Sequence, residues 1–226
     1  WAGTKHPIGM AHFCLGLVAC QLGEYAVAHT RLIKSLGLLR EIEHSDVHYP
    51  LNTLGNLANL QGDYAAAQTY YAECLALRRK LVDKRGIAAT LADIANLKSK
   101  QGDPVAAHTL YTESITLFRE MGNQRGMVWG LSGLARLCQN NGHCQLAAKL
   151  SGAVDALLKA LNARVDEPES SDSARAVVLL RTQLGEANFN SVWTAGQHVT
   201  LEEAIALAQQ NLESVWGRVG AYTAFA

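Results

Sequence analysis

The side chains best suited to chemistry are the cysteines and histidines, and their spacing matches no familiar catalytic or metal site. Five cysteines lie at positions 14, 20, 74, 138 and 144, and eight histidines are scattered along the chain. The tightest cluster, Cys138, His143 and Cys144, has neither CxxC nor helical HxxxH spacing. Adjacent residues on a helix point about 100° apart, so His143 and Cys144 do not easily face one substrate. We therefore expect no catalytic residue, no metal site, no cofactor and no enzymatic activity.

A second group of polar residues could form hydrogen bonds to a ligand from one face of a helix. Tyr49, Asn52, Asn56 and Asn59 fall within an arc of about 80° at 3.6 residues per turn. Each asparagine has two donors and an acceptor, so a ladder of them can hold an extended peptide backbone without reading its side chains. The alternative is that these residues are polar only because they face water. The same offsets further along the chain give Asn96, Trp129, Arg136 and Gln139.

Trp129 and Arg136 form a second candidate contact, seven residues apart on one helix face. A large aromatic ring beside a planar cation suits the few contacts that dominate binding energy. Trp129 could equally pack beneath the C-terminal part of the chain, and the sequence leaves both interpretations open.

An internal repeat supplies the helices that would position these residues. Glycines at 23, 62, 102 and 142 are separated by 39, 40 and 40 residues, and each lies between two helical segments. Glycine at such a turn ends the first helix, and Asp63 or Asp103 can then cap the second. Small pairs at constant offsets, Gly55/Ala67, Ala95/Ala107 and Ala135/Ala147, predict close approach of the paired helices, with Tyr71 and Tyr111 filling the gaps between repeats.

The repeat pattern disappears near position 161. An acidic segment, 161–172, reads as a linker, and three further helices are expected over 174–184, 186–195 and from Thr200 onwards. Thr200 to Glu203 has the spacing of a capping box. Because the last repeat of an array needs its open apolar edge covered, we interpret 173–226 as a helical cap.

The repeat resembles the tetratricopeptide repeat in its form of about 40 residues, over roughly 8–160. This implies an all-α, right-handed superhelix, an α-solenoid, with repeats at about 9–45, 46–84, 85–124 and 125–160. Segments such as Leu184–Gly185–Glu186–Ala187 and Leu201–Glu202–Glu203–Ala204 also resemble the C-terminal end of large bacterial signal-transducing ATPases, including LuxR-type transcriptional regulators. The resemblance implies a sensor or regulatory module that binds a protein or peptide, which could be another part of its parent chain. A sugar or metabolite sensor is the alternative.

Composition limits the other partners. The chain has 20 Lys+Arg and 20 Asp+Glu, which disfavours direct nucleic-acid contact, and it has no apolar run long enough to span a membrane. An odd number of cysteines in apolar patterns favours reduced thiols and a cytoplasmic location. The chain lacks an initiator Met and reads as a piece of something longer. Met10, Phe13, Leu17 and Cys20 form an apolar stripe in the first repeat, so we also expect the stripe to be buried, either by self-association through the N-terminal edge or by residues 1–8 folding across it.

Overall fold

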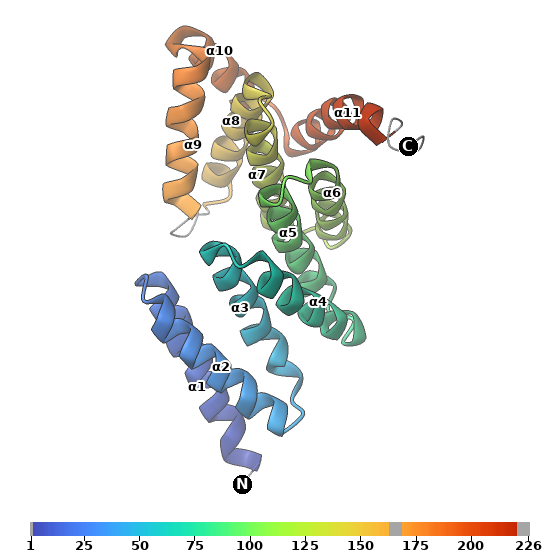
Figure 1. Ribbon diagram of the computed structural model, residues 1–226. Helices are drawn as coiled ribbons and strands as arrows, with labels where there is room; N and C mark the ends of the chain where they lie inside the picture. The colour runs from blue at the N-terminus through green and yellow to red at the C-terminus, as the bar shows by residue number, and fades with distance from the viewer. Residues whose placement is uncertain (1, 163–168, 221–226) are drawn as a thin grey trace. The chain divides into compact units, whose positions relative to one another are not determined.

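The computed structural model is helical throughout the residues it describes, which are 2–162 and 169–220, with side chains for 4–162 and 173–210. Within these ranges there are eleven α-helices, one short 3-10 helix and no strand (Figure 1), which confirms the all-α prediction. The elements are α1 (Ala2–Gln21), α2 (Tyr25–Glu41), η1 (Ser45–Val47), α3 (His48–Gln61), α4 (Tyr64–Lys80), α5 (Lys84–Lys100), α6 (Pro104–Glu120), α7 (Gln124–Asn140), α8 (Cys144–Ala160), α9 (Glu169–Leu184), α10 (Glu186–Gln197) and α11 (Leu201–Gly220).

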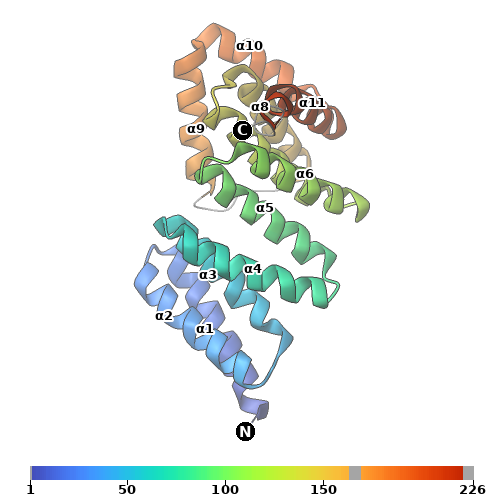
Figure 2. The same ribbon diagram turned by 45° about the vertical axis from the view of Figure 1, so that its right-hand side comes forward.

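The helices form hairpins with tight turns at the repeated glycines. Helix α1 packs on α2, α3 on α4, and α7 on α8 (Figures 1 and 2). Gly62 ends α3 with φ of 81°, a left-handed conformation that glycine adopts without a steric penalty. Asp63 then caps α4 by accepting a hydrogen bond from Ala66 N at 3.0 Å, and Asp103 accepts one from Ala106 N at 3.0 Å. The predicted helix–turn–helix repeats are therefore confirmed, with eight helices before the acidic segment.

The chain forms two compact units, Trp1–Leu97 and Lys98–Ala226, which divide within α5. In the first unit the core is aliphatic, and the side chains of Leu32, Leu39 and Leu51 are fully buried. In the second unit Ile115, Leu131, Leu134 and Leu150 are equally buried. Each unit thus has its own hydrophobic core, built from the apolar stripes of its helices.

Close approach between helices depends on small residues, as the repeat pattern predicts. A Cβ atom added to Gly55 would lie 2.5 Å from Cε1 of Tyr71, whose ring packs directly on the glycine. Gly133 receives the ring of Tyr111 from the preceding repeat, where the added atom would lie 2.2 Å from Cε1, whereas Gly55 and Tyr71 belong to the same repeat. Both tyrosines are almost completely buried, at 1% and 2% exposure. Packing therefore explains a glycine in the middle of a helix, where it is unfavourable by propensity.

The last three helices pack against the final repeat within the second unit. Helix α10 lies on α8, and α11 contacts α6, α7 and α8. Ala204, Ile205 and Ala208 of α11 are completely buried. Helix α9 begins at Glu169, inside the segment 161–172 expected as a linker; 163–168 lie outside the described residues. Residues 169–173 include no Gly or Pro, so nothing in that stretch stops a helix from extending backwards from 174. None of the described helices is both long and apolar enough to cross a membrane.

Candidate functional site

The members of the cysteine–histidine cluster considered from the sequence lie in different environments. Cys138 is completely buried, and burial raises the pKa of its thiol to about 12, so it stays protonated at neutral pH. Cys144 lies at the start of α8, where its Sγ donates to Oε1 of Gln183 at 3.2 Å. All five cysteines are free thiols. The two thiols nearest His143 thus occupy different environments, one in the core and one at a helix end.

On helix α3, two of the candidate residues reach the surface. Asn56 is exposed, and its Oδ1 accepts a hydrogen bond from the hydroxyl of the buried Tyr71 at 2.6 Å. Tyr49 is 42% exposed and its ring packs against Phe13 and His48, with centroids 5.6 and 4.1 Å away. Contacts with neighbouring side chains therefore hold both residues in place, while part of each side chain faces solvent.

The two other asparagines of α3 are less accessible. Asn59 is only 5% exposed. Asn52 donates from Nδ2 to Oδ2 of Asp93 at 2.9 Å, and its Oδ1 accepts from Arg78 and Thr90, each at 3.3 Å. Helical periodicity places these residues on one face but cannot show that neighbouring helices cover part of it. Of the four α3 residues, Tyr49 and Asn56 are exposed, Asn52 is partly exposed and Asn59 is buried.

The partners of Asn52 belong to a buried polar network that the sequence pattern did not indicate. Arg78, 7% exposed, donates from one guanidinium nitrogen to Gly86 O at 2.7 Å and to Oγ1 of Thr90 at 2.6 Å. Asp83 lies 3.9 Å from Nε of Arg78. Burial raises the pKa of the adjacent Cys74 thiol, partly offset by the Arg78 charge, so the thiol remains a donor to His48 O at 3.4 Å. The network joins α3, α4 and α5 within the first unit.

The remaining candidates divide between the units. Asn96 in α5 is partly exposed and occupies the position in its repeat that Asn56 holds in the one before. In the second unit, Trp129 is partly exposed and packs edge-on against Phe118, with centroids 6.4 Å apart. Nη2 of Arg136 donates to the hydroxyl of Tyr111 at 3.4 Å. Gln139 donates to Ala176 O of α9 at 3.0 Å, so its amide takes part in attaching α9.

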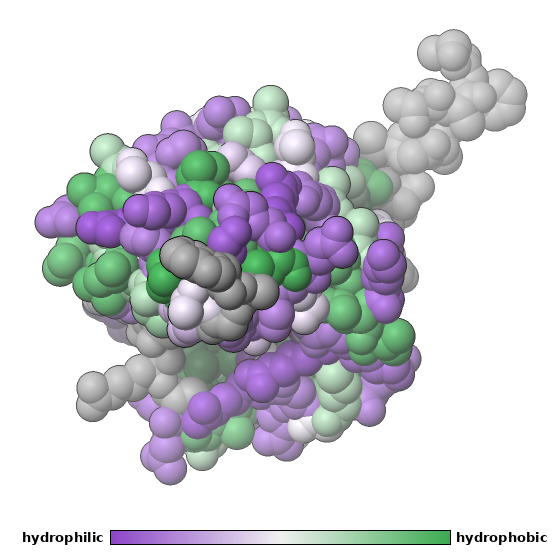
Figure 3. All heavy atoms as spheres, turned by 90° about the horizontal axis from the view of Figure 1, so that it is seen from below, coloured by the Kyte–Doolittle hydropathy of each residue, from purple (hydrophilic) through white to green (hydrophobic). Residues whose placement is uncertain are grey.

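Three of the four residues of the expected N-terminal stripe are partly buried in the first unit. Met10, Phe13 and Cys20 pack partly against the core of the first unit, because α1 turns these residues towards α2 and α3. Leu17, the fourth residue of the expected stripe, is 37% exposed. The other large apolar residues exposed on α1 and its end are Ile8, Leu15, Val18 and Leu22, at 48%, 51%, 51% and 68%. We call these four the N-terminal apolar face. Figure 3, viewed from the end where α1 begins, shows hydrophobic patches among hydrophilic surface.

The structure also brings together three residues that sequence spacing did not connect. His6 of α1 and His44 and Asp46 from the segment before α3 place their side-chain ligand atoms within 4.8 Å of one another. His6 and His44 lie 38 residues apart, about one repeat length. His6 lies within α1 and His44 in the connection before η1, so no local spacing in the sequence could have suggested the pair.

Comparison with known proteins supports the repeat assignment for the middle of the chain. Residues 46–120 match the family model described as Tetratricopeptide repeat. The match runs from η1 to the end of α6 and covers about a third of the chain, which includes the second and third predicted repeats. No curated protein matches the chain. Repeats of this family suggest a protein-interaction module, and residues 46–120 are assigned to that family on the match and on their helical hairpins.

Proposed function

We propose that the chain is a non-catalytic module that binds an extended peptide or protein segment through Asn56 and Asn96 of the first unit. The observation that carries the proposal is the geometry of Asn56. Its carbonyl oxygen is fixed by the Tyr71 hydroxyl at 2.6 Å while the residue remains exposed. An amide oriented in this way keeps its two N–H donors for a backbone carbonyl of a ligand. The tetratricopeptide-repeat match over 46–120, which includes both asparagines, agrees with such a role.

Trp129 and Arg136 are proposed as a second contact, belonging to the other unit. Arg136 donates a hydrogen bond to Tyr111, which occupies the position in its repeat that Tyr71 holds in the one before. The ring of Trp129 packs against Phe118. Both remain partly exposed on α7, which suits a fixed aromatic ring and a fixed cation for contact with a side chain of the ligand. Gln139, whose amide already bonds to α9, contributes less.

The ligand and its contacts can be tested by selecting peptides from a displayed random library and measuring affinity by fluorescence anisotropy. We expect Asn56→Ala and Asn96→Ala each to weaken binding about fivefold, because one hydrogen bond contributes about 1 kcal/mol. Trp129→Ala should weaken it more, as removal of an anchoring aromatic does. Alanine substitution along the peptide should have little effect at positions held only through their backbone.

The matched control is Asn188→Ala, an exposed asparagine on α10 away from the proposed contacts. Equal loss of affinity in this variant, or none in the Asn56 and Asn96 variants, contradicts the proposal. If the library yields no binder while a panel of sugars and metabolites raises the melting temperature, the small-molecule sensor is the better function.

We further propose that the module regulates a larger bacterial signal-transduction ATPase or transcriptional regulator in the cytoplasm. Support comes from the segments around Leu184 and Leu201 that resemble the C-terminal ends of such proteins. Binding would shift the parent's switch to the extent that the module distinguishes its two states. The coding sequence upstream of Trp1 tests this: a G-x-x-x-x-G-K-[ST] phosphate-binding loop supports it, and an unrelated domain contradicts it.

A further inference from the structure

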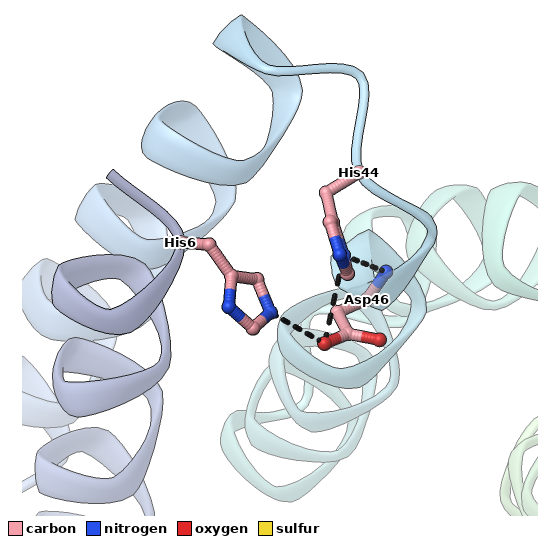
Figure 4. Close-up of side chains that lie close together, drawn as sticks. All are labelled: His6, His44 and Asp46. Carbon is pink, nitrogen blue, oxygen red and sulfur yellow. Dashed lines mark hydrogen bonds and ion pairs between the residues drawn. The ribbon is translucent and has the colours of Figure 1, made fainter. Parts of the chain in front are cut away.

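We infer that His6, His44 and Asp46 form a binding site for a divalent transition-metal cation, with Zn²⁺ the best match. The three side chains come from two segments of the first unit, the start of α1 and the connection that leads through η1 into α3. Figure 4 shows the His6 ring beside the Asp46 carboxylate and the His44 ring above it, with both rings close to the same carboxylate oxygen. Neither the repeat pattern nor the proposed peptide-binding residues include any of them, so the inference is independent of the proposed function.

The distances fit a metal-centred arrangement. Nε2 of His6 lies 2.8 Å and Nδ1 of His44 lies 3.5 Å from the same carboxylate oxygen, Oδ2 of Asp46. Ligand atoms about 2.0 Å from a tetrahedral Zn²⁺ are separated by about 3.3 Å, so the 3.5 Å pair is already close to what the ion requires. The 2.8 Å pair is a hydrogen bond without metal and would open by about 0.5 Å on binding. The side chains are 38%, 39% and 26% exposed, which gives a cation access from solvent and leaves the fourth position for water.

The hydrogen bonds around His44 also point to a cation. Nδ1 of His44 accepts a hydrogen bond from the backbone N–H of Asp46 at 3.2 Å, which makes Nδ1 the unprotonated nitrogen in that tautomer. The carboxylate oxygen 3.5 Å away is also an acceptor, so no hydrogen bond joins these two atoms in that tautomer. Because Nδ1 has one lone pair in the ring plane, it would exchange the Asp46 amide for the metal on binding. The His6 ring adds to the crowding, with its centroid 4.1 Å from that of His44. A divalent cation among these atoms would turn adjacent acceptors into ligands.

The donor types select the metal. Two imidazole nitrogens and one carboxylate oxygen suit Zn²⁺, Ni²⁺, Co²⁺ and Cu²⁺, whereas Ca²⁺ and Mg²⁺ prefer all-oxygen sites. Neighbouring contacts already hold the two segments together, since Lys5 Nζ pairs with Glu41 Oε2 at 2.7 Å. Bound metal would therefore cross-link the first turns of α1 to the start of the second repeat. The expected role is structural, with one coordination position open to solvent.

The site can be tested on the full chain, free of any affinity tag and kept reduced with a non-chelating phosphine. Isothermal titration with Zn²⁺ should give one site per chain, and Zn²⁺ should raise the melting temperature. We expect His6→Gln, His44→Asn and Asp46→Asn each to weaken Zn²⁺ binding by at least about 100-fold, because substitutions outside the ligand shell alone cost about 10- to 100-fold. Asparagine at position 44 retains a side-chain acceptor for the Asp46 amide, so η1 should still form.

Two controls separate this site from other donors. His29→Gln removes an exposed histidine of α2 outside the cluster, and Cys14→Ser removes an exposed thiol of α1. Both should bind Zn²⁺ like the wild type, and Co²⁺ spectra should lack thiolate charge-transfer bands. The inference is overturned if the wild type binds no Zn²⁺, if the three cluster variants bind it normally, or if Cys14→Ser abolishes binding. Should a cluster variant fail to fold by circular dichroism, shifts of the His6 and His44 ring signals in wild-type NMR spectra on adding Zn²⁺ decide the matter.

Discussion

Arg78 shows how much one residue can contribute to a repeat junction. In the repeats before and after, the equivalent positions are the buried Leu39 and Phe118, so a guanidinium occupies a place otherwise filled by an apolar side chain. Its cost of burial is offset by bonds to Gly86 O and Thr90 Oγ1 and by the Asp83 carboxylate. A buried cation with these partners links the three helices around it.

We predict that Arg78→Ala lowers the free energy of unfolding by about 3 kcal/mol, because it leaves a cavity and removes the donor from several buried acceptors. Urea denaturation measures the change. Arg79→Ala, at the exposed neighbouring position, should stay within about 0.5 kcal/mol of the wild type. Similar losses in both variants would mean that the network adds little. Arg78→Met, which restores apolar packing, should be less harmful than Arg78→Ala.

Two helical glycines offer a matched pair for the packing argument. An added Cβ at Gly55 would lie 2.5 Å from the Tyr71 ring, whereas one at Gly37 in α2 meets nothing within 4 Å. We predict that Gly55→Ala destabilises the chain by about 1 to 3 kcal/mol through overpacking. Gly37→Ala should instead stabilise it by about 0.5 to 1 kcal/mol, because alanine has the higher helix propensity. Thermal unfolding of both variants tests the pair; changes of the same sign would refute the packing explanation.

At the scale of elements, helix α11 depends on how its first turn is capped. Thr200 Oγ1 accepts from Glu203 N at 3.3 Å, and the Glu203 carboxylate accepts from Thr200 N at 2.8 Å, the reciprocal pair expected from the sequence. The hydrogen bonds from the backbone and side chain of Thr200 lower the pKa of Glu203. The ionised carboxylate is therefore the form that the folded helix favours.

Because the folded-state pKa is lowered, the contribution of Glu203 is present above the ordinary glutamate pKa and is lost as the pH falls through the lowered value. We predict that the wild type loses more stability on acidification than Glu203→Gln does, as measured by urea unfolding from neutral to acidic pH. Glu113→Gln, at an exposed site on α6, should keep the wild-type pH dependence. If both variants follow the wild type, the capping carboxylate does not contribute. Thr200→Ala should cost about 1 kcal/mol at neutral pH.

At the scale of the whole molecule, the N-terminal apolar face defines a further expected contact. Ile8, Leu15 and Leu22 recur every seven residues, with Val18 between the last two, and 7–22 includes no Asp, Glu, Lys or Arg. An exposed helix face of this kind is uncommon on monomeric proteins. We propose that two copies of the chain associate through it.

Sedimentation velocity over a range of concentrations tests this association. We predict that the wild type forms dimers and that the double variant Leu15→Glu, Val18→Glu is monomeric, because burying the two introduced carboxylates at the contact is unfavourable. Ile33→Glu, which changes an exposed residue of α2 outside the face, should dimerise like the wild type. A wild type that is monomeric at high concentration, or an Ile33 variant that also loses dimers, contradicts the proposed contact.

Sequence alone determined the features that depend on residues close together in the chain. The glycine turns, the Asp63 and Asp103 caps and the Thr200 capping box each involve side chains within about four residues, so their spacing predicts them directly. Periodicity also indicated that a small residue at 55 allows close helix approach, but it did not predict that Tyr71 of the same repeat would pack on that glycine. The tertiary structure decided which of several similar side chains remain exposed and which are bonded to neighbouring helices. Asn52 and Asn56 lie one helical turn apart, yet the first is engaged by α4 and α5 and the second remains exposed. The Arg78 network and the meeting of His6 with His44 and Asp46 likewise depend on how successive helices pack, and that packing is set by side chains distant in the sequence.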